Sequence, residues 1–157
     1  MAVFEPRDPD FVARVRADFA RQGLMATLGA NLVNVAPGAV TITLPFRADL
    51  TQQHGYLHAG VVTAIVDSAC GYAALSLLPA GVEVLTVEYK VNFLAPATGP
   101  VFVARGRVTR PGRTLTVCTG DVVVPGTDGR ERHVATMLTT MMAVPPSAEA
   151  RELVSGF

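Results

Sequence analysis

One long apolar stretch, residues 57–78, constrains the fold of this chain more than any other feature. Between His58 and Glu83 the only charged side chain is Asp67. A helix that is apolar on every side must be covered by other protein or by lipid. The stretch is long enough to span a membrane, but it lacks flanking Lys or Arg clusters and would hold a costly carboxylate in mid-span. We therefore predict a buried core helix with one carboxylate placed in it for a purpose.

Length, charge and cysteine spacing narrow the class of protein. The 157 residues suit a single domain over 1–157, and the 13 basic and 13 acidic side chains balance. Balanced charge gives no support for nucleic acid or an anionic membrane as a partner. The first ten residues hold no apolar run of the signal-peptide kind, so we expect a cytoplasmic protein. Cys70 and Cys118 lack the spacing of a zinc site or disulfide framework, and Cys70 is expected to be a core residue.

Turn signals divide the rest of the chain into one further helix and six strands. The helix is predicted at 9–22 and ends at Gly23, and the Pro37-Gly38 pair predicts a hairpin turn. Strands are predicted at 30–36, 39–44, 83–94, 101–109, 114–124 and 130–144, with a loop at 47–56 and a tail at 145–157. Alternation along 83–94 predicts one face of Leu85, Val87, Tyr89, Val91 and Phe93, and another of Thr86, Glu88, Lys90 and Asn92.

This order of elements predicts an α+β fold. A sheet of about six mainly antiparallel strands can hide an apolar helix only by curving around it, which is a hotdog shape with its core at about 28–144. Even then one side of the helix needs a second cover. We therefore expect a homodimer.

Asp67 is the first candidate for chemistry. A buried, unpaired carboxylate on a helix without a polar face costs several kcal/mol of folding free energy. It is either paired with an Arg from a strand, or kept as a general base or nucleophile.

A second cluster lies at the start of the same helix, where Gln52, Gln53, His54 and His58 crowd together. A helix N-terminus offers free backbone N–H groups that can hold a polarised carbonyl or an anion. Alternatively, His58 merely caps the helix and the glutamines satisfy loop carbonyls. His58 and Asp67 are nine residues apart, half a turn net, so they point to opposite sides of one helix and can share a site only across a two-fold axis.

Several motifs are similar to those of one family. An amide residue (Gln52), a short loop and a His-x-Gly sequence at 58–60 precede Asp67, and the segments 85–96 and 110–114 complete the pattern. Over most of 28–144 the sequence resembles the hotdog-fold thioesterases of the phenylacetate-pathway (PaaI-like) type.

This resemblance implies a role for each matching residue. Asp67 would be the general base or nucleophile, and the N–H of Ala59, beside Gly60, would polarise the thioester carbonyl. His58 would orient the carbonyl or the leaving thiolate, Gln52 would position water or substrate, and Thr86 would lie near the attacking water. Arg113, with Arg110, would meet the coenzyme A phosphates. The sequence departs from the family's pattern at two positions. Ala59 replaces the first glycine of His-Gly-Gly, and Gln52 replaces the more frequent Asn.

The expected function is hydrolysis of acyl-CoA thioesters without a metal or redox cofactor, with coenzyme A entering only as part of the substrate. A non-catalytic acyl-CoA sensor of the same fold is the alternative. A hydratase usually needs a different arrangement of His and acid, which the sequence lacks. The expected assembly is a homodimer with shared active sites, or a dimer of dimers.

Overall fold

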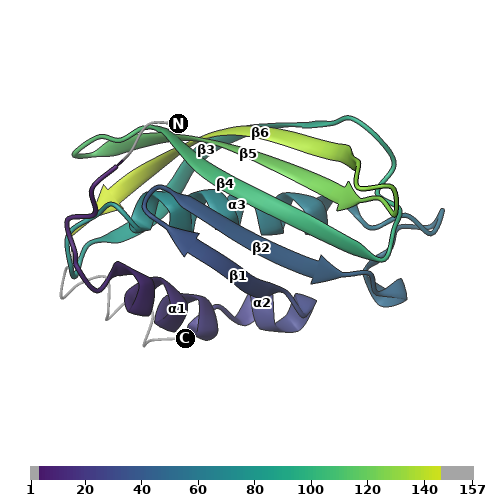
Figure 1. The fold of residues 1–157 in the computed structure, drawn as a ribbon, viewed down its shortest axis with the longest axis horizontal. Coiled ribbons are helices and arrows are strands. Elements are labelled where there is room, and N and C mark those ends of the chain that lie inside the picture. Colours follow the sequence, from purple (N-terminus) through teal and green to yellow (C-terminus); the bar gives the residue numbers. More distant parts are fainter. Residues whose placement is uncertain (1–3, 146–157) are drawn as a thin grey trace.

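The described residues of this computed structural model, 4–145, form a curved antiparallel sheet around one central helix (Figure 1). The helices are α1 (Phe11–Arg21), α2 (Gly23–Leu28), the central α3 (Ala59–Leu75) and a short 3-10 helix, η1 (Ala48–Leu50). The strands are β1 (Asn31–Ala36), β2 (Ala39–Pro45), β3 (Glu83–Phe93), β4 (Val101–Arg110), β5 (Leu115–Pro125) and β6 (Glu131–Val144). Their order in the sheet is β1-β2-β4-β5-β6-β3. The predicted hotdog architecture is confirmed.

Two glycines let α3 lie directly on the sheet. A Cβ at Gly106 of β4 would lie 2.3 Å from the backbone of Ala69, and a Cβ at Gly120 of β5 would lie 2.5 Å from Val66 Cγ2. Real Cβ atoms do not approach other atoms so closely. The absence of a side chain at these two positions therefore sets the distance between helix and sheet.

The C-terminal end of α3 is held by α1. The Arg14 guanidinium donates hydrogen bonds to the carbonyl oxygens of Leu75, Leu78 and Pro79 at 2.6–2.9 Å, and its Nε lies 3.2 Å from the Asp8 carboxylate. Leu75 ends α3, so the positive charge of Arg14 lies at the negative end of the helix dipole. The N-terminal helix is therefore a fixed part of the fold.

The predicted end of the first helix is only partly right. The helix ends at Arg21, but Gly23 begins α2, which continues to Leu28. Gln22 interrupts the helical backbone with ψ at 98°, so a bend separates the two helices. Met25 and Leu28 of α2 are buried, and this burial offsets the weak helix propensity of glycine.

The predicted faces of the strand at 83–94 are corrected by a β-bulge. Thr86 pairs with Met141 and Glu88 with Thr140, so Val87 is an extra residue without a partner. The bulge shifts the alternation by one position. Thr86 therefore lies on the helix side of the sheet with Tyr89, rather than on the outer side with Glu88.

The predicted first hairpin, strand bounds and loop agree closely with the structure. The hairpin at 37–38 is present, with Gly38 at φ 71°, and each strand bound differs from the predicted one by at most one residue. The predicted loop at 47–56 contains η1. Within residues 4–145, every helix is too short or too polar to cross a bilayer. The predicted tail lies outside the described residues after position 145.

Candidate active site

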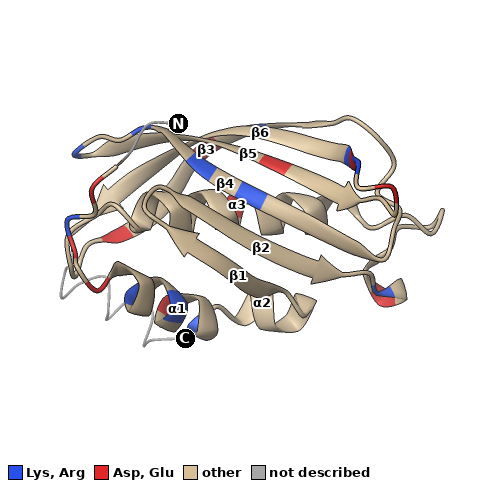
Figure 2. Cartoon of the chain, in the orientation of Figure 1, with Lys and Arg blue, Asp and Glu red and all other residues tan. Residues whose placement is uncertain are grey.

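Asp67 is the one charged residue of α3 (Figure 2). It lies on the side of the helix that faces β3, because it contacts Thr86 of that strand. Its Oδ1 accepts a hydrogen bond from Thr86 Oγ1 at 3.0 Å. Partial burial raises the pKa of the Asp67 carboxyl, and the Thr86 hydrogen bond offsets part of that rise. Among the described residues no cation pairs with this carboxylate. Within residues 4–145, Asp67 therefore lacks the Arg partner that a purely structural role would require.

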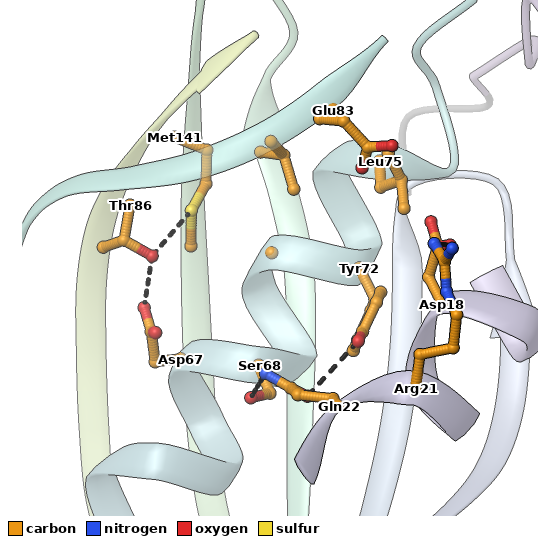
Figure 3. A pocket seen from close by; sticks show the side chains of 12 residues that line it. Asp18, Arg21, Gln22, Asp67, Ser68, Tyr72, Leu75, Glu83, Thr86 and Met141 are labelled. Carbon is orange, nitrogen blue, oxygen red and sulfur yellow. Dashed lines mark hydrogen bonds and ion pairs between the residues drawn. The ribbon is translucent and has the colours of Figure 1, made fainter. Parts of the chain in front are cut away.

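Two hollows meet at Asp67. One is a cavity of about 510 Å³ that reaches towards α1 and is lined by Gln22, Ser68 and Tyr72 (Figure 3). The other is a groove of about 400 Å³ between α3 and β3, with Tyr89 and Phe93 on its walls. A carboxylate at the junction of two hollows can contact the reacting group of a ligand that occupies both.

The start of α3 presents one unused backbone donor. His58 Nδ1 accepts a hydrogen bond from the Gly60 N–H at 2.9 Å. This histidine therefore caps the helix, as the alternative to a catalytic role predicted. A Cβ at residue 60 would lie 3.1 Å from the same Nδ1, which explains a glycine here. Val61 and Val62 donate to the His58 carbonyl. Among the described residues, the Ala59 N–H has no acceptor.

One chain cannot bring the Ala59 N–H and Asp67 to the same group. Eight residues separate them, which is about 12 Å along a helix axis. The N–H groups of the first turn also point out of the N-terminus, away from Asp67. A carbonyl held by Ala59 is therefore out of reach of the same chain's carboxylate.

Gln52 is held within its own loop. Its Oε1 accepts a hydrogen bond from the His54 N–H, and its backbone N–H donates to the Tyr56 carbonyl at 2.9 Å. The Gln52 side chain therefore binds a loop N–H, whereas the structural alternative had it bind a loop carbonyl. A part for Gln52 in positioning water stays a prediction.

Comparison with known proteins identifies the family of this chain. A sequence model of the thioesterase superfamily matches residues 54–128, which include His58, Asp67 and Arg113. A crystal structure of a thioesterase family protein from Silicibacter pomeroyi is 52% identical, with a TM-score of 0.83, over 87% of this chain and 99% of that one. The chain belongs to the thioesterase superfamily.

Two further relatives refine the comparison. The PaaI protein of Escherichia coli, from the phenylacetic acid degradation operon, shares the fold with a TM-score of 0.78 at 18% identity, over 90% of this chain and 98% of that one. The 1,4-dihydroxy-2-naphthoyl-CoA hydrolase of Listeria monocytogenes is 26% identical over 60% of this chain and 77% of that one. The resemblance to PaaI-like hotdog thioesterases is confirmed.

Arg110 and Arg113 lie far from the N-terminus of α3. Arg110 ends β4, and Arg113 lies in the turn between β4 and β5, which packs near Leu77 and Leu78 at the other end of α3. The 17 residues of α3 separate the two ends by about 25 Å. Both arginines are exposed, and a contact with coenzyme A phosphates stays a prediction.

The two cysteines are too buried to act as nucleophiles. Burial raises the pKa of the Cys70 thiol and brings that of Cys118 to about 12, so neither is a thiolate nucleophile. Within residues 4–145 no three His, Cys, Asp or Glu side chains group closely enough for a metal ion. Metal-free chemistry stays a prediction.

Three residues beside Asp67 were missed by reasoning from the sequence. Gln22, Ser68 and Tyr72 line the larger cavity and are joined by hydrogen bonds. The signal available in the sequence was weak: a serine next to Asp67 and a polar residue before Gly23. Their meeting depends on how α1 packs against α3, which no local pattern shows.

Proposed function

We propose that this protein hydrolyses acyl-CoA thioesters to a free acid and coenzyme A, with Asp67 as general base or nucleophile. The observation that carries the proposal is the Asp67 carboxylate, which has no cationic partner among the described residues and lies where two hollows meet. The naphthoyl-CoA hydrolase relative supports a CoA thioester as substrate.

The chemistry requires two proton transfers and one bond exchange. As a base, Asp67 takes a proton from a water molecule, whose oxygen attacks the carbonyl carbon. The C–S bond then breaks and the departing sulfur takes up a proton, which gives an acid and a thiol. As a nucleophile, Asp67 attacks first and water cleaves the resulting anhydride. In both routes an N–H at a helix N-terminus stabilises the charge on the carbonyl oxygen.

A second copy of the chain supplies the missing end of the site. Among residues 4–145, no strand lies beside the outer edge of β3, and Leu85, Val87, Tyr89 and Phe93 on this strand are 48–57% exposed. A long edge strand with exposed apolar side chains favours pairing with another strand. This edge supports a homodimer formed through β3.

The direction of α3 means that such a dimer would bring Asp67 of one chain to the helix N-terminus of the other. The helix begins beside the end of β3, where the Leu57 N–H donates to the Ala97 carbonyl at 3.0 Å, while Asp67 contacts Thr86 nearer the start of the strand. Antiparallel pairing of two β3 strands about Glu88, their midpoint, brings the start of one strand beside the end of the other. Each Asp67 then faces the partner's helix N-terminus, where its Ala59 N–H is free.

Release of free thiol tests this function. The Asp67→Asn variant should lower thioester hydrolysis by a factor of about 10² to 10⁴, the loss expected for a general base or nucleophile. The matched control is Asp10→Asn, the same change at an exposed helix N-cap, which should keep wild-type turnover. Tight binding of acyl-CoA by the wild type without thiol release would favour the sensor. A folded Asp67→Asn protein with near wild-type turnover would make Asp67 structural.

A further inference from the structure

The loop between β3 and β4, residues 94–100, lies against the residues that precede α3. The Ala97 carbonyl in the middle of this loop accepts the hydrogen bond from the Leu57 N–H at 3.0 Å. Leu57 is 2% exposed, and its backbone leads directly into His58 and Ala59, the cap and the first residue of α3. The position of the Ala59 N–H therefore depends on where this loop holds Leu57.

Arg132, near the start of β6, holds the loop on both sides of Ala97. Its Nη1 donates to the Pro96 carbonyl at 2.6 Å. Its Nη2 donates to the Thr98 carbonyl and, at 2.9 Å, to Thr98 Oγ1. A guanidinium is a planar, rigid fork of donors, so these bonds fix the two residues that flank Ala97 relative to each other and to the sheet.

Other hydrogen bonds to the loop lie outside its middle, residues 96–98. The Leu94 N–H, for example, donates to the Val134 carbonyl of β6 at 2.8 Å. Among the described residues, hydrogen bonds from Arg132 and Leu57 alone tie 96–98 to the rest of the fold. Loss of the Arg132 contacts would therefore let the middle of the loop move, and Leu57 with it.

The charge of Arg132 serves to hold this loop. Within residues 4–145 its guanidinium has no carboxylate partner, because the preceding Glu131 pairs with Arg105 of β4. Every hydrogen bond that the guanidinium makes with the described residues goes to the loop. Hydrogen bonds from a charged donor are stronger than those from a neutral one.

Building on the hydrolase function above, we propose that Arg132 is a positioning residue for the Ala59 N–H. It fixes Ala97, which in turn fixes Leu57 and the start of α3. A donor that stabilises a developing oxyanion must lie about 2.7 to 3.1 Å from the charged oxygen, so a small displacement of this N–H weakens catalysis. Arg132 acts through the loop and not by contact with the substrate.

Kinetics of two Arg132 variants test the proposal. Arg132→Gln should lower kcat for acyl-CoA hydrolysis by about tenfold and keep KM within about twofold, since the N–H bonds the carbonyl oxygen most strongly in the transition state. Arg132→Lys keeps the charge but lacks the rigid fork, so it should recover only part of the loss. The matched control is Arg105→Gln, the same change at an arginine that pairs with Glu131, which should keep near wild-type kcat.

Hydrogen exchange of the Leu57 amide, followed by NMR, tests the same link without turnover. In Arg132→Gln this amide should exchange about tenfold faster than in the wild type, because its acceptor is less firmly held. The Ala143 N–H, which donates to the Thr114 carbonyl near the other end of β6, should exchange at the wild-type rate and so exclude global destabilisation. Unchanged exchange at Leu57 would overturn the proposal.

Subunit exchange places the lesion at the helix N-terminus. In the proposed dimer, Arg132 and Ala59 of one chain serve the same site, and Asp67 of that chain serves the other. Mixing Arg132→Gln with Asp67→Asn chains should therefore restore roughly a quarter of the wild-type rate under two-fold symmetry. Mixing Arg132→Gln with Ala59→Pro, which lacks the N–H, should restore none. Recovery in both mixtures would overturn the proposal.

These readouts separate the positioning role from the hydrolase function. Thiol release by the wild type, with an unchanged kcat in Arg132→Gln, would overturn the positioning role and leave the hydrolase standing. Absence of thiol release by the wild type would contradict the hydrolase. Even then, faster exchange of the Leu57 amide in Arg132→Gln would support the link from Arg132 to the start of α3, and unchanged exchange would overturn it.

Discussion

At the scale of single residues, Asp67 is held in a state that costs folding free energy. It lies on an apolar helix, and its only described partner is the Thr86 hydroxyl, a neutral group that cannot balance the charge. Partial burial raises the pKa of its carboxyl, which makes it a stronger base than an exposed aspartate. Strain of this kind is common at functional sites, where activity and stability oppose each other.

This account predicts the pH dependence of stability. Because the folded-state pKa of Asp67 is raised, the folded state holds its proton more firmly than the unfolded chain does. The contribution of Asp67 to the free energy of unfolding is present below the unfolded pKa and is lost as pH rises through the folded pKa. Asp67→Asn should therefore be more stable than the wild type at pH 7, and the difference should shrink as the pH falls towards 4.

Denaturant titrations at several pH values, at one protein concentration, measure this difference. An Asp67→Asn protein less stable than the wild type at neutral pH would show that the carboxylate makes a favourable interaction that the described residues lack. Asp10→Asn serves again as the control and should show no such pH-dependent gain.

At the scale of elements, the contact of α3 with the sheet depends on two glycines of different tolerance. At Gly106 an added Cβ would meet backbone atoms of Ala69, whereas at Gly120 it would meet side chains of Val66 and Cys70. Side chains can shift and a packed helix backbone cannot. The two positions therefore differ in cost, although their patterns in the sequence look alike.

Alanine substitutions test this difference. Gly106→Ala should lower the free energy of unfolding by about 3 kcal/mol, and Gly120→Ala by less, since overpacking a core costs about 1 to 3 kcal/mol. Gly23→Ala is the control, because nothing lies within 4 Å of a Cβ there, and it should be neutral or slightly stabilising. Equal effects at Gly106 and Gly120, measured by denaturant unfolding, would contradict the ranking.

The elements were largely predictable, and the exceptions have physical causes. The apolar stretch and the Pro-Gly pair are local signals, so α3 and the first hairpin follow from the sequence. The bulge at Val87 has no local signal, because the sequence around it still alternates between apolar and polar residues. The bulge brings the Thr86 hydroxyl to Asp67, whereas simple alternation would place Thr86 on the opposite face of the sheet. The contacts of Gln22 with Ser68 and Tyr72 join residues 46 and 50 positions apart and depend on tertiary packing.

The turn between β4 and β5 carries the prediction for Arg113. If this side chain binds a phosphate of coenzyme A, Arg113→Ala should raise KM for an acyl-CoA by roughly tenfold or more, the loss of one charge-assisted hydrogen bond. A truncated thioester without the nucleotide should be unaffected. Arg130→Ala, at the next turn, controls for loss of charge. Equal effects of Arg113→Ala on both substrates would remove Arg113 from phosphate binding.

At the scale of the whole molecule, the proposed mechanism needs two chains. The free Ala59 N–H and the Asp67 carboxylate are at separate places on one rigid helix, and the arginines of the β4–β5 turn are at its far end. The proposed two-fold axis at the edge of β3 would bring these two groups together without any change of fold. The exposed apolar side chains of β3 and the position of Asp67 thus have one explanation.

Complementation between two inactive variants tests the shared site most directly. Ala59→Pro removes the proposed donor N–H at a first helical position, where proline is well tolerated, and the extended backbone of His58 (φ −62°, ψ 139°) suits a residue before proline. Asp67→Asn removes the carboxylate. Each variant alone should be folded and near background in thiol release.

After the two variants are mixed and exchange subunits, each mixed dimer holds one site with both lesions and one site with neither. Random pairing makes roughly half of the dimers mixed, so activity should recover to roughly a quarter of the wild-type rate under two-fold symmetry. Native mass spectrometry confirms that mixed dimers form. Full activity of Ala59→Pro alone, or mixed dimers without recovery, would contradict a site built from Asp67 of one chain and the Ala59 N–H of the other.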